Sequence, residues 1–221
     1  MARRTVRFLF DYISPYAYLA WTQVGPVLAR QDADLELVPI LFAALLDALG
    51  TKGPAEIPPK RLWVFKDTFR HAAHLGVPFA PPPAHPFNPL LALRLTAAPM
   101  AEPQRKALCD LLFKATWGGG PGVIDEAALS TLMKDAGFDA EQLLAAAKTD
   151  EVKAKVRGNT EAALRAGAFG VPSFLVGDEL FWGLDSLGHL ERHLAGQDPL
   201  TPADLERWRE LPAASHRPKG R

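Results

Sequence analysis

Ser14 is the residue whose type and position point most directly to chemistry in this sequence. It precedes Pro15, and serine followed by proline is typical of an N-cap and the first position of a helix. The unpaired amides and the positive dipole end of such a helix stabilise a nearby anion by about 0.3–1 kcal/mol. The Ser14 hydroxyl therefore suits a thiolate or a carboxylate. Helix capping alone is the simpler explanation, and this stretch by itself leaves both roles open.

The other residues with chemical potential give weaker indications. His71 and His74 lie three residues apart on a predicted helix, and His85 lies in a proline-rich loop, with no cysteine nearby and no carboxylate at ligand spacing. The sequence therefore predicts no metal site. The single cysteine, Cys109, cannot form an internal disulfide, and its apolar neighbours predict a buried helical position. The glycine run at residues 118–122 lacks the lysine of a phosphate loop and predicts a turn.

Composition excludes several classes of protein. The chain has 221 residues, of which 48% are hydrophobic, which is enough for a sizeable core in one domain or in one domain with a large insertion. Its 25 basic and 25 acidic residues create no overall field that would attract nucleic acid or anionic lipid. No apolar run is long enough to span a membrane, and residues 1–4 lead into a strand instead of a signal peptide. We therefore expect a soluble, cytoplasmic protein.

Two strands and a helix are predicted around Ser14. Residues 6–10 form a short apolar and aromatic run that suits a buried strand, residues 15–30 have helical spacing, and residues 35–40 alternate like a second strand. Strand, helix and strand in this order predict a parallel βαβ unit with a right-handed crossover. Ser14 would then lie at the carboxyl end of the first strand.

The strand pattern then disappears until residues 173–176 and 180–182, which are joined by a two-residue turn. Asp185 is expected to cap a final helix. Helices are predicted between the two strand regions at residues 42–49, 60–75, 90–97, 102–117, 125–133, from 139 onwards and 151–165, while the proline-dense residues 77–89 predict an ordered surface crossing. The sheet is therefore split around a helical block. Neither sheet fragment would have a core alone, which disfavours two separate domains.

A front βαβ unit joined to a back αββα unit resembles the thioredoxin fold, with residues 170–174 at the place of its cis-proline loop. Five segments in order resemble the 2-hydroxychromene-2-carboxylate isomerases and kappa-class glutathione transferases of the DsbA-like superfamily: residues 10–19, Asn88 with 91–94, 159–162, 167–174 and 181–185. The resemblance covers about residues 5–195. It implies an α/β thioredoxin-like domain made of residues 1–42 and 151–221, with residues 43–150 as an all-helical insertion.

The resemblance changes the interpretation of Ser14. Redox members of the superfamily have C-x-x-C where this chain has residues 14–17, Ser-Pro-Tyr-Ala, so thiol–disulfide exchange by the protein itself is excluded. In the isomerases and kappa transferases, the serine at this place donates a hydrogen bond to the sulfur of bound glutathione. A hydroxyl at a helix N-terminus favours thiolate over thiol and lowers the thiol pKa from about 8.5 towards neutrality. Ser14 is thereby implied as the catalytic residue.

The resemblance also implies the remainder of a glutathione site. A cis bond between Val171 and Pro172 would turn the backbone of Val171 towards the peptide part of glutathione, whereas an ordinary trans proline is the alternative. The two loops carrying Ser14 and Pro172 are expected to touch, at the carboxyl ends of adjacent strands. The Asp185 carboxylate, with the amides of Leu184 and Ser186, would hold the γ-glutamyl ammonium and carboxylate, and this role is compatible with helix capping.

Two departures from the family pattern affect the predicted contacts. The family commonly has Asp-Arg where this chain has Asp-Ser at residues 185–186, and often has Gly-Asn in the loop that here includes Lys52. Lys52, Lys60 or Arg61 is expected to meet a carboxylate in place of the missing asparagine contact.

The substrate pocket is the part of the site for which the sequence gives the weakest indications. Tyr12, Tyr16, Lys60 and Asn88 are predicted to line it. The alternatives are that the tyrosines belong to the core and that Asn88 is a turn residue before Pro89.

The sequence therefore predicts a glutathione-dependent isomerase that acts on a small aromatic, pyruvate-like substrate, as in the degradation of aromatic compounds. By resemblance, the thiolate adds to a conjugated alkene, the resulting single bond rotates, and elimination returns glutathione. A kappa-like glutathione transferase and a non-catalytic thioredoxin-fold binding protein remain alternatives. The aromatic and proline-rich surface between residues 63 and 87, together with the resemblance, predicts a homodimer.

Overall fold

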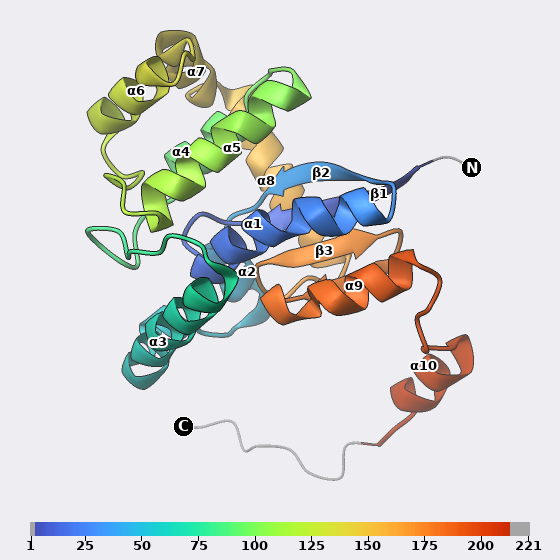
Figure 1. Cartoon of the computed structure of the whole chain (residues 1–221). Helices are drawn as coiled ribbons and strands as arrows, with labels where there is room; N and C mark the ends of the chain where they lie inside the picture. Colours follow the sequence, from blue (N-terminus) through green and yellow to red (C-terminus); the bar gives the residue numbers. More distant parts are fainter. Residues whose placement is uncertain (1–2, 213–221) are drawn as a thin grey trace.

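A four-stranded mixed sheet forms the centre of the protein, which the computed structural model describes from residue 3 to residue 212 (Figure 1). The strand order is β2-β1-β3-β4. β1 (Arg4–Phe10) pairs parallel with β2 (Ala33–Pro39) and antiparallel with β3 (Ser173–Val176), and β3 pairs antiparallel with β4 (Glu179–Trp182). The predicted parallel βαβ unit and the antiparallel return are both confirmed.

β1 has a neighbouring strand on each edge, and both of its faces are buried. Adjacent side chains on a strand point to opposite faces, so Phe8 and Phe10 pack into one core cluster and Leu9 packs into the other. Phe8 stacks on Phe10 and on Phe174 of β3, with ring centroids 5.1 Å apart in both pairs. This strand is thus fixed on both sides up to the point where the Ser14 loop begins.

Helices cover both faces of the sheet. α1 (Pro15–Arg30) and α9 (Leu187–Leu194) contact each other on the Phe8 side, and α2 (Phe42–Leu49) contacts α8 (Asp150–Arg165) on the Leu9 side (Figure 1). The bounds of α1 and α2 are the predicted ones. α8 begins one residue earlier than predicted, because the side chain of Thr149 caps it by accepting from the Val152 N–H.

The chain between β2 and β3 folds into further helices. They are the 3₁₀ turn η1 (Pro54–Glu56), α3 (Pro58–Leu75), α4 (Leu90–Ala97), α5 (Glu102–Trp117), α6 (Glu126–Asp135) and α7 (Ala140–Ala147), followed by α8. This insertion shares the main core with the sheet: the Phe113 ring of α5 lies 5.4 Å from Phe10 and 4.6 Å from Tyr12. The division at residues 42 and 151 stays a prediction.

Two features at the C-terminal end differ from the sequence-based expectation. Asp185 does not cap α9: Leu184–Ser186 form the 3₁₀ turn η2, and α9 starts at Leu187 without a side-chain cap. Gly183, at φ 93°, starts this turn, and α9 begins one residue later than a cap at Asp185 would give. The helix α10 (Pro202–Arg209) was not predicted, although Thr201 and the acidic residue three positions later form a capping box.

None of the helices within residues 3–212 combines the length and the apolarity that crossing a membrane requires.

Candidate functional site

Ser14 caps α1 and has one further hydrogen bond. Its Oγ accepts from the Ala17 N–H at 3.2 Å, and Pro15 at the first helical position has no N–H to satisfy. The hydroxyl donates to the carbonyl oxygen of Val171 at 3.4 Å, which is beyond the usual range for a strong bond. The hydroxyl proton is therefore weakly held and lies at the positive end of a helix, as the sequence predicts.

The Val171–Pro172 loop meets Ser14 as predicted. The bond between these two residues is cis. The Ser173 hydroxyl donates to the Gly170 carbonyl at 2.8 Å, and the Gly183 N–H donates to the Pro172 carbonyl at 2.9 Å. The expected reason for the contact is wrong, however. β3 is antiparallel to β1, so the loop precedes β3 and it is the amino end of β3 that lies beside the carboxyl end of β1.

The indole of Trp182 packs against the backbone of this loop, which the sequence analysis did not anticipate. A Cβ atom on Gly170 would lie 2.4 Å from Trp182 Nε1, and the Trp182 ring centroid lies 5.0 Å from that of Phe169. Glycine is therefore required at position 170 for the indole to cover the loop that carries Val171.

We expect Gly170→Ala to destabilise the protein by about 1–3 kcal/mol, because the new methyl overlaps the indole and forces it or the loop to move. Chemical denaturation measures the loss. In a Trp182→Ala background the same substitution has space and should cost far less, so a double-mutant cycle should show strong coupling. Equal losses in both backgrounds would show that the indole contact is not the cause.

Asp11 is a buried carboxyl directly before the Ser14 loop. Its Oδ1 accepts from the Ile13 N–H at 3.0 Å and its Oδ2 from the Phe42 N–H at 2.9 Å, so it ties the loop to the start of α2. Burial raises the pKa of Asp11 to about 7, against the opposing effect of the two N–H donors. The backbone carbonyl of Asp11 also accepts from the Ser14 N–H at 3.1 Å.

Tyr16 lies at the same end of α1, at the junction with α3. Its hydroxyl donates to Asp67 Oδ2 at 2.7 Å, and His71 Nε2 lies 3.5 Å from the same oxygen. Burial, followed by the effects of Asp67 and Asp185, raises the pKa of Tyr16, so the hydroxyl stays protonated. The structure therefore brings Tyr16 and the predicted γ-glutamyl ligand Asp185 close to the helix end that carries Ser14, since η2 also packs on α1.

Two predicted pocket residues have local structural roles. Tyr12 is fully buried, and its hydroxyl shares a 2.6 Å hydrogen bond with Thr96. This places Tyr12 in the core and corrects its assignment to the pocket. Asn88 is exposed, and its Oδ1 accepts from the Leu90 N–H at 3.0 Å. That geometry is a turn at the start of α4, and a substrate contact of Asn88 stays a prediction.

The remaining predicted ligands differ in their exposure. Lys52 is exposed in the loop after α2, and Lys60 is exposed in the first turn of α3. Asp185 is exposed, and no residue between 3 and 212 forms a hydrogen bond with its carboxylate. Leu184 is half-buried and Ser186 is buried, with the Ser186 hydroxyl donating to the Gly183 carbonyl at 2.8 Å. The contacts of these residues with a ligand stay predictions.

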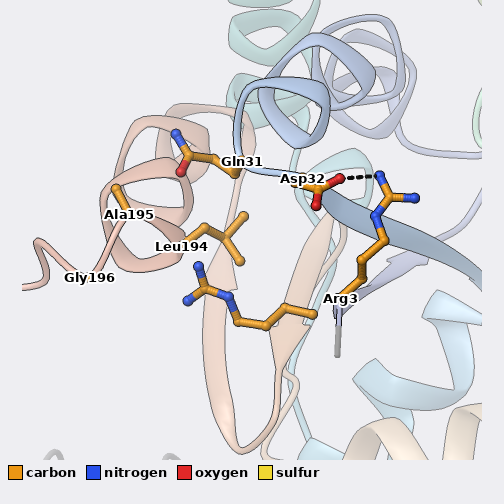
Figure 2. A pocket seen from close by; sticks show the side chains of 7 residues that line it. Arg3, Gln31, Asp32, Leu194, Ala195 and Gly196 are labelled. Atoms are coloured by element: carbon orange, nitrogen blue, oxygen red, sulfur yellow. Dashed lines mark ion pairs between the residues drawn. The ribbon is translucent and has the colours of Figure 1, made fainter. Parts of the chain in front are cut away.

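A separate hollow of about 490 Å³ lies at the opposite end of the sheet (Figure 2). Its lining residues are Arg3, Arg4, Gln31, Asp32, Leu194, Ala195 and Gly196. Arg3 forms an ion pair with Asp32 at 2.7 Å across its rim. Because β1 starts at Arg4 and Ser14 follows its other end, this hollow is not part of the Ser14 site.

Within the described residues, no three side chains of His, Cys, Asp or Glu converge in a way that would hold a metal ion.

Comparisons with known proteins agree with this geometry. The DSBA-like thioredoxin domain family matches residues 5–195. The 2-hydroxychromene-2-carboxylate isomerase of Sphingobium xenophagum is 30% identical over 193 residues, which cover 86% of this chain and 98% of that protein. Glutathione S-transferase kappa 1 of Homo sapiens is 29% identical over 218 residues, 90% of this chain and 96% of that one.

A solved structure of a 2-hydroxychromene-2-carboxylate isomerase superposes with a TM-score of 0.80 at 25% sequence identity, covering 87% of this chain and 95% of the other. The match therefore extends over the sheet and the helical insertion together. The chain belongs to the DSBA-like thioredoxin domain family, as a member of its 2-hydroxychromene-2-carboxylate isomerase and kappa-class glutathione transferase group.

Proposed function

We propose that this protein is a glutathione-dependent isomerase of the 2-hydroxychromene-2-carboxylate isomerase type, acting on a small aromatic, pyruvate-like substrate. The observation that carries the proposal is the Ser14 hydroxyl, which lies at the N-terminus of α1 and touches the Val171 carbonyl in a motif without a thiol. Such a site has no group for redox chemistry of its own but is suited to stabilising the sulfur of a bound thiol.

The residues present fit glutathione. The Ser14 hydroxyl donates only weakly to the Val171 carbonyl, so it is free to donate to a sulfur instead. In that orientation Ser14 Oγ still accepts from the Ala17 N–H. The backbone of Val171 is suited to form hydrogen bonds with the peptide part of glutathione. The exposed carboxylate of Asp185 is suited to form an ion pair with the γ-glutamyl ammonium. Lys52 is our proposed partner for a glutathione carboxylate. Glutathione supplies a thiolate that adds reversibly to a conjugated double bond, which permits rotation before the thiolate leaves.

In this reaction the protein's own groups stabilise the negative charge on the sulfur and orient the substrate. The Ser14 hydroxyl and the first amides of α1 stabilise negative charge at the sulfur, which keeps the thiolate available near neutral pH. Tyr16 keeps its proton, which its hydroxyl donates to Asp67, and we propose that its side chain lines the substrate pocket. Lys60 at the start of α3 is proposed to attract the carboxylate of the substrate.

An activity assay combined with a glutathione titration tests the proposal. We expect saturable glutathione binding by calorimetry, and conversion of 2-hydroxychromene-2-carboxylate to its ring-opened isomer that requires glutathione. Binding with conjugation of an electrophile but no isomerisation would assign the kappa-like transferase activity instead. Binding without either reaction would indicate a non-catalytic binding protein, and absence of binding would contradict the proposal as a whole.

We also propose that the protein is a cytoplasmic homodimer. Three large apolar side chains of α3 are exposed: Leu62 at 58%, Trp63 at 56% and Phe69 at 61%. Leu62 and Phe69 are seven residues apart and therefore lie on the same side of the helix, with Trp63 about 100° away. Exposed apolar side chains of this kind are typical of an interface between subunits.

Sedimentation at micromolar concentration should accordingly give a dimer mass for the wild type. The double variant Trp63→Asp and Phe69→Asp should be a monomer, because it would bury two charges in the interface. Trp208→Asp is the matched control, since Trp208 is also exposed but lies on α10. A monomeric wild type would rule out this assembly.

A further inference from the structure

Two ring N–H groups from the helical insertion hold the backbone directly before Ser14. Trp117 Nε1, at the end of α5, donates to the Tyr12 carbonyl at 2.8 Å. His85 Nε2 lies 3.0 Å from the Ile13 carbonyl oxygen. These two carbonyls are consecutive, and both belong to the loop between β1 and α1.

The His85 bond has a direct geometric consequence for Ser14. The Ile13 carbonyl and the Ser14 N–H belong to one planar peptide unit. His85 holds the carbonyl end of that unit, and the Asp11 carbonyl accepts from its N–H end at 3.1 Å. With both ends fixed, the unit cannot rotate, so the direction in which the Ser14 side chain leaves the backbone is set.

The surroundings of His85 select one protonation state. A carbonyl oxygen only accepts, so Nε2 carries a hydrogen, and in the neutral ring Nδ1 is then the bare nitrogen. Nδ1 is buried and has no hydrogen-bond partner within residues 3–212. The rings of Phe65, Phe87 and Trp117 lie around the imidazole at steep angles of 72°, 68° and 65°. Burial lowers the pKa of His85 and the charge of Arg61 acts in the same direction, against the hydrogen bond to Ile13.

His85 reaches this position because the segment between α3 and α4 is anchored elsewhere. The Tyr18 hydroxyl donates to the Pro78 carbonyl at 2.7 Å, and the Ala80 N–H donates to the Trp117 carbonyl at 2.7 Å. Trp117 therefore serves twice: its backbone holds the proline-rich segment and its indole holds the Ser14 loop. The segment is a fixed support for the imidazole.

We propose that His85 is a positioning residue for the reaction, whose neutral imidazole fixes the Ile13–Ser14 peptide unit and so aims the Ser14 hydroxyl at the glutathione sulfur. The inference builds on the proposed function and extends it to a residue of the helical insertion. His85 acts through Ser14 and needs no contact with substrate.

This role is tested by two substitutions of His85, one that keeps a hydrogen-bond donor near the Ile13 carbonyl and one that removes it. The side-chain amide of His85→Gln reaches the place of Nε2, so it keeps the bond to Ile13, while His85→Phe fills the aromatic surroundings without a donor. We expect His85→Phe to lower kcat roughly threefold to tenfold, as loss of one neutral hydrogen bond implies, with KM for glutathione nearly unchanged. His85→Gln should restore most of kcat. His74→Phe, at an exposed position on α3, is the matched control and should behave as wild type.

A spectroscopic readout makes the test independent of glutathione. In ¹⁵N NMR spectra the wild-type imidazole should carry its proton on Nε2, and the amide resonance of Ser14 should shift in His85→Phe and return in His85→Gln. A proton on Nδ1, an unmoved Ser14 amide, or equal kcat in the Phe and Gln variants would each overturn the positioning role. If the wild type binds no glutathione, the proposed function fails, while the NMR comparison still decides whether His85 positions Ser14.

Discussion

Ser14→Ala should lower kcat of the glutathione-dependent reaction roughly ten- to hundredfold. The variant removes one hydrogen bond to a charged sulfur, which is worth about 1.5–3 kcal/mol, and each 1.4 kcal/mol of lost stabilisation is about a factor of ten. It also removes the acceptor of the Ala17 N–H and so costs about 0.5–2 kcal/mol of stability. Steady-state kinetics and denaturation, measured on the same preparation, separate the two effects.

Thr149→Ala is the matched control for the capping effect. Thr149 caps α8 by accepting from the Val152 N–H at 3.3 Å, and it is exposed on a helix that starts away from Ser14. We expect a similar loss of stability and unchanged kcat. If Ser14→Ala and Thr149→Ala lose stability equally and neither loses activity, Ser14 is only a helix cap.

The contribution of Asp11 to the stability of the protein should fall as pH rises from about 4 to 7. Its pKa is about 7 in the folded protein against 3.8 as a free side chain, so in this range the folded state keeps a proton that the unfolded state has released. Stability decreases with pH wherever the folded state binds more protons. The contribution is complete below about pH 4, is lost through pH 7, and is on the order of a few kcal/mol.

Asp11→Asn should flatten this dependence, because the amide does not ionise. Its single oxygen can accept from only one of the two N–H groups of Ile13 and Phe42, so the variant has a constant penalty at every pH. The measurement is therefore the slope of unfolding free energy against pH, obtained from urea titrations at several pH values. Parallel curves for wild type and variant would show that Asp11 is not the titrating group.

Local signals in the sequence were sufficient for most of the framework. The apolar strand β1 and the Ser14-Pro15 helix start are both encoded by neighbouring residues, and their bounds agree closely with the structure. The contact of Ser14 with the Val171–Pro172 loop followed from the family resemblance, and it is present. The reason for the contact could not be predicted, because it depends on β3 running antiparallel to β1, which places the amino end of β3 beside the carboxyl end of β1.

The residues that the sequence analysis missed depend on contacts between distant segments. Asp11 follows an apolar strand, a placement that signals a buried carboxyl, but its bond to Phe42 requires the path of the chain after β2. His85 was considered only as a metal ligand, because nothing local shows that a proline-rich segment returns to the Ser14 loop. For Tyr12 the sequence left the pocket and the core both open, because its hydroxyl partner Thr96 lies 84 residues away, in α4.

The helical insertion therefore has a larger part in the site than the sequence indicates. It supplies the donors to the Ser14 loop from Trp117 and His85, and it holds the Tyr16 hydroxyl through Asp67. A thioredoxin-like domain without this insertion would have Ser14 on a loop with two free carbonyls. We infer that the insertion stabilises the geometry of Ser14.

The thiolate titration of bound glutathione tests the central claim most directly. The ultraviolet absorbance of the thiolate, followed against pH for wild type and Ser14→Ala saturated with glutathione, reports the pKa of the bound thiol. We predict a pKa near neutrality for wild type and a value higher by roughly one to two units in Ser14→Ala. Identical titration curves for the two proteins would contradict the assignment of Ser14 as the group that stabilises the sulfur.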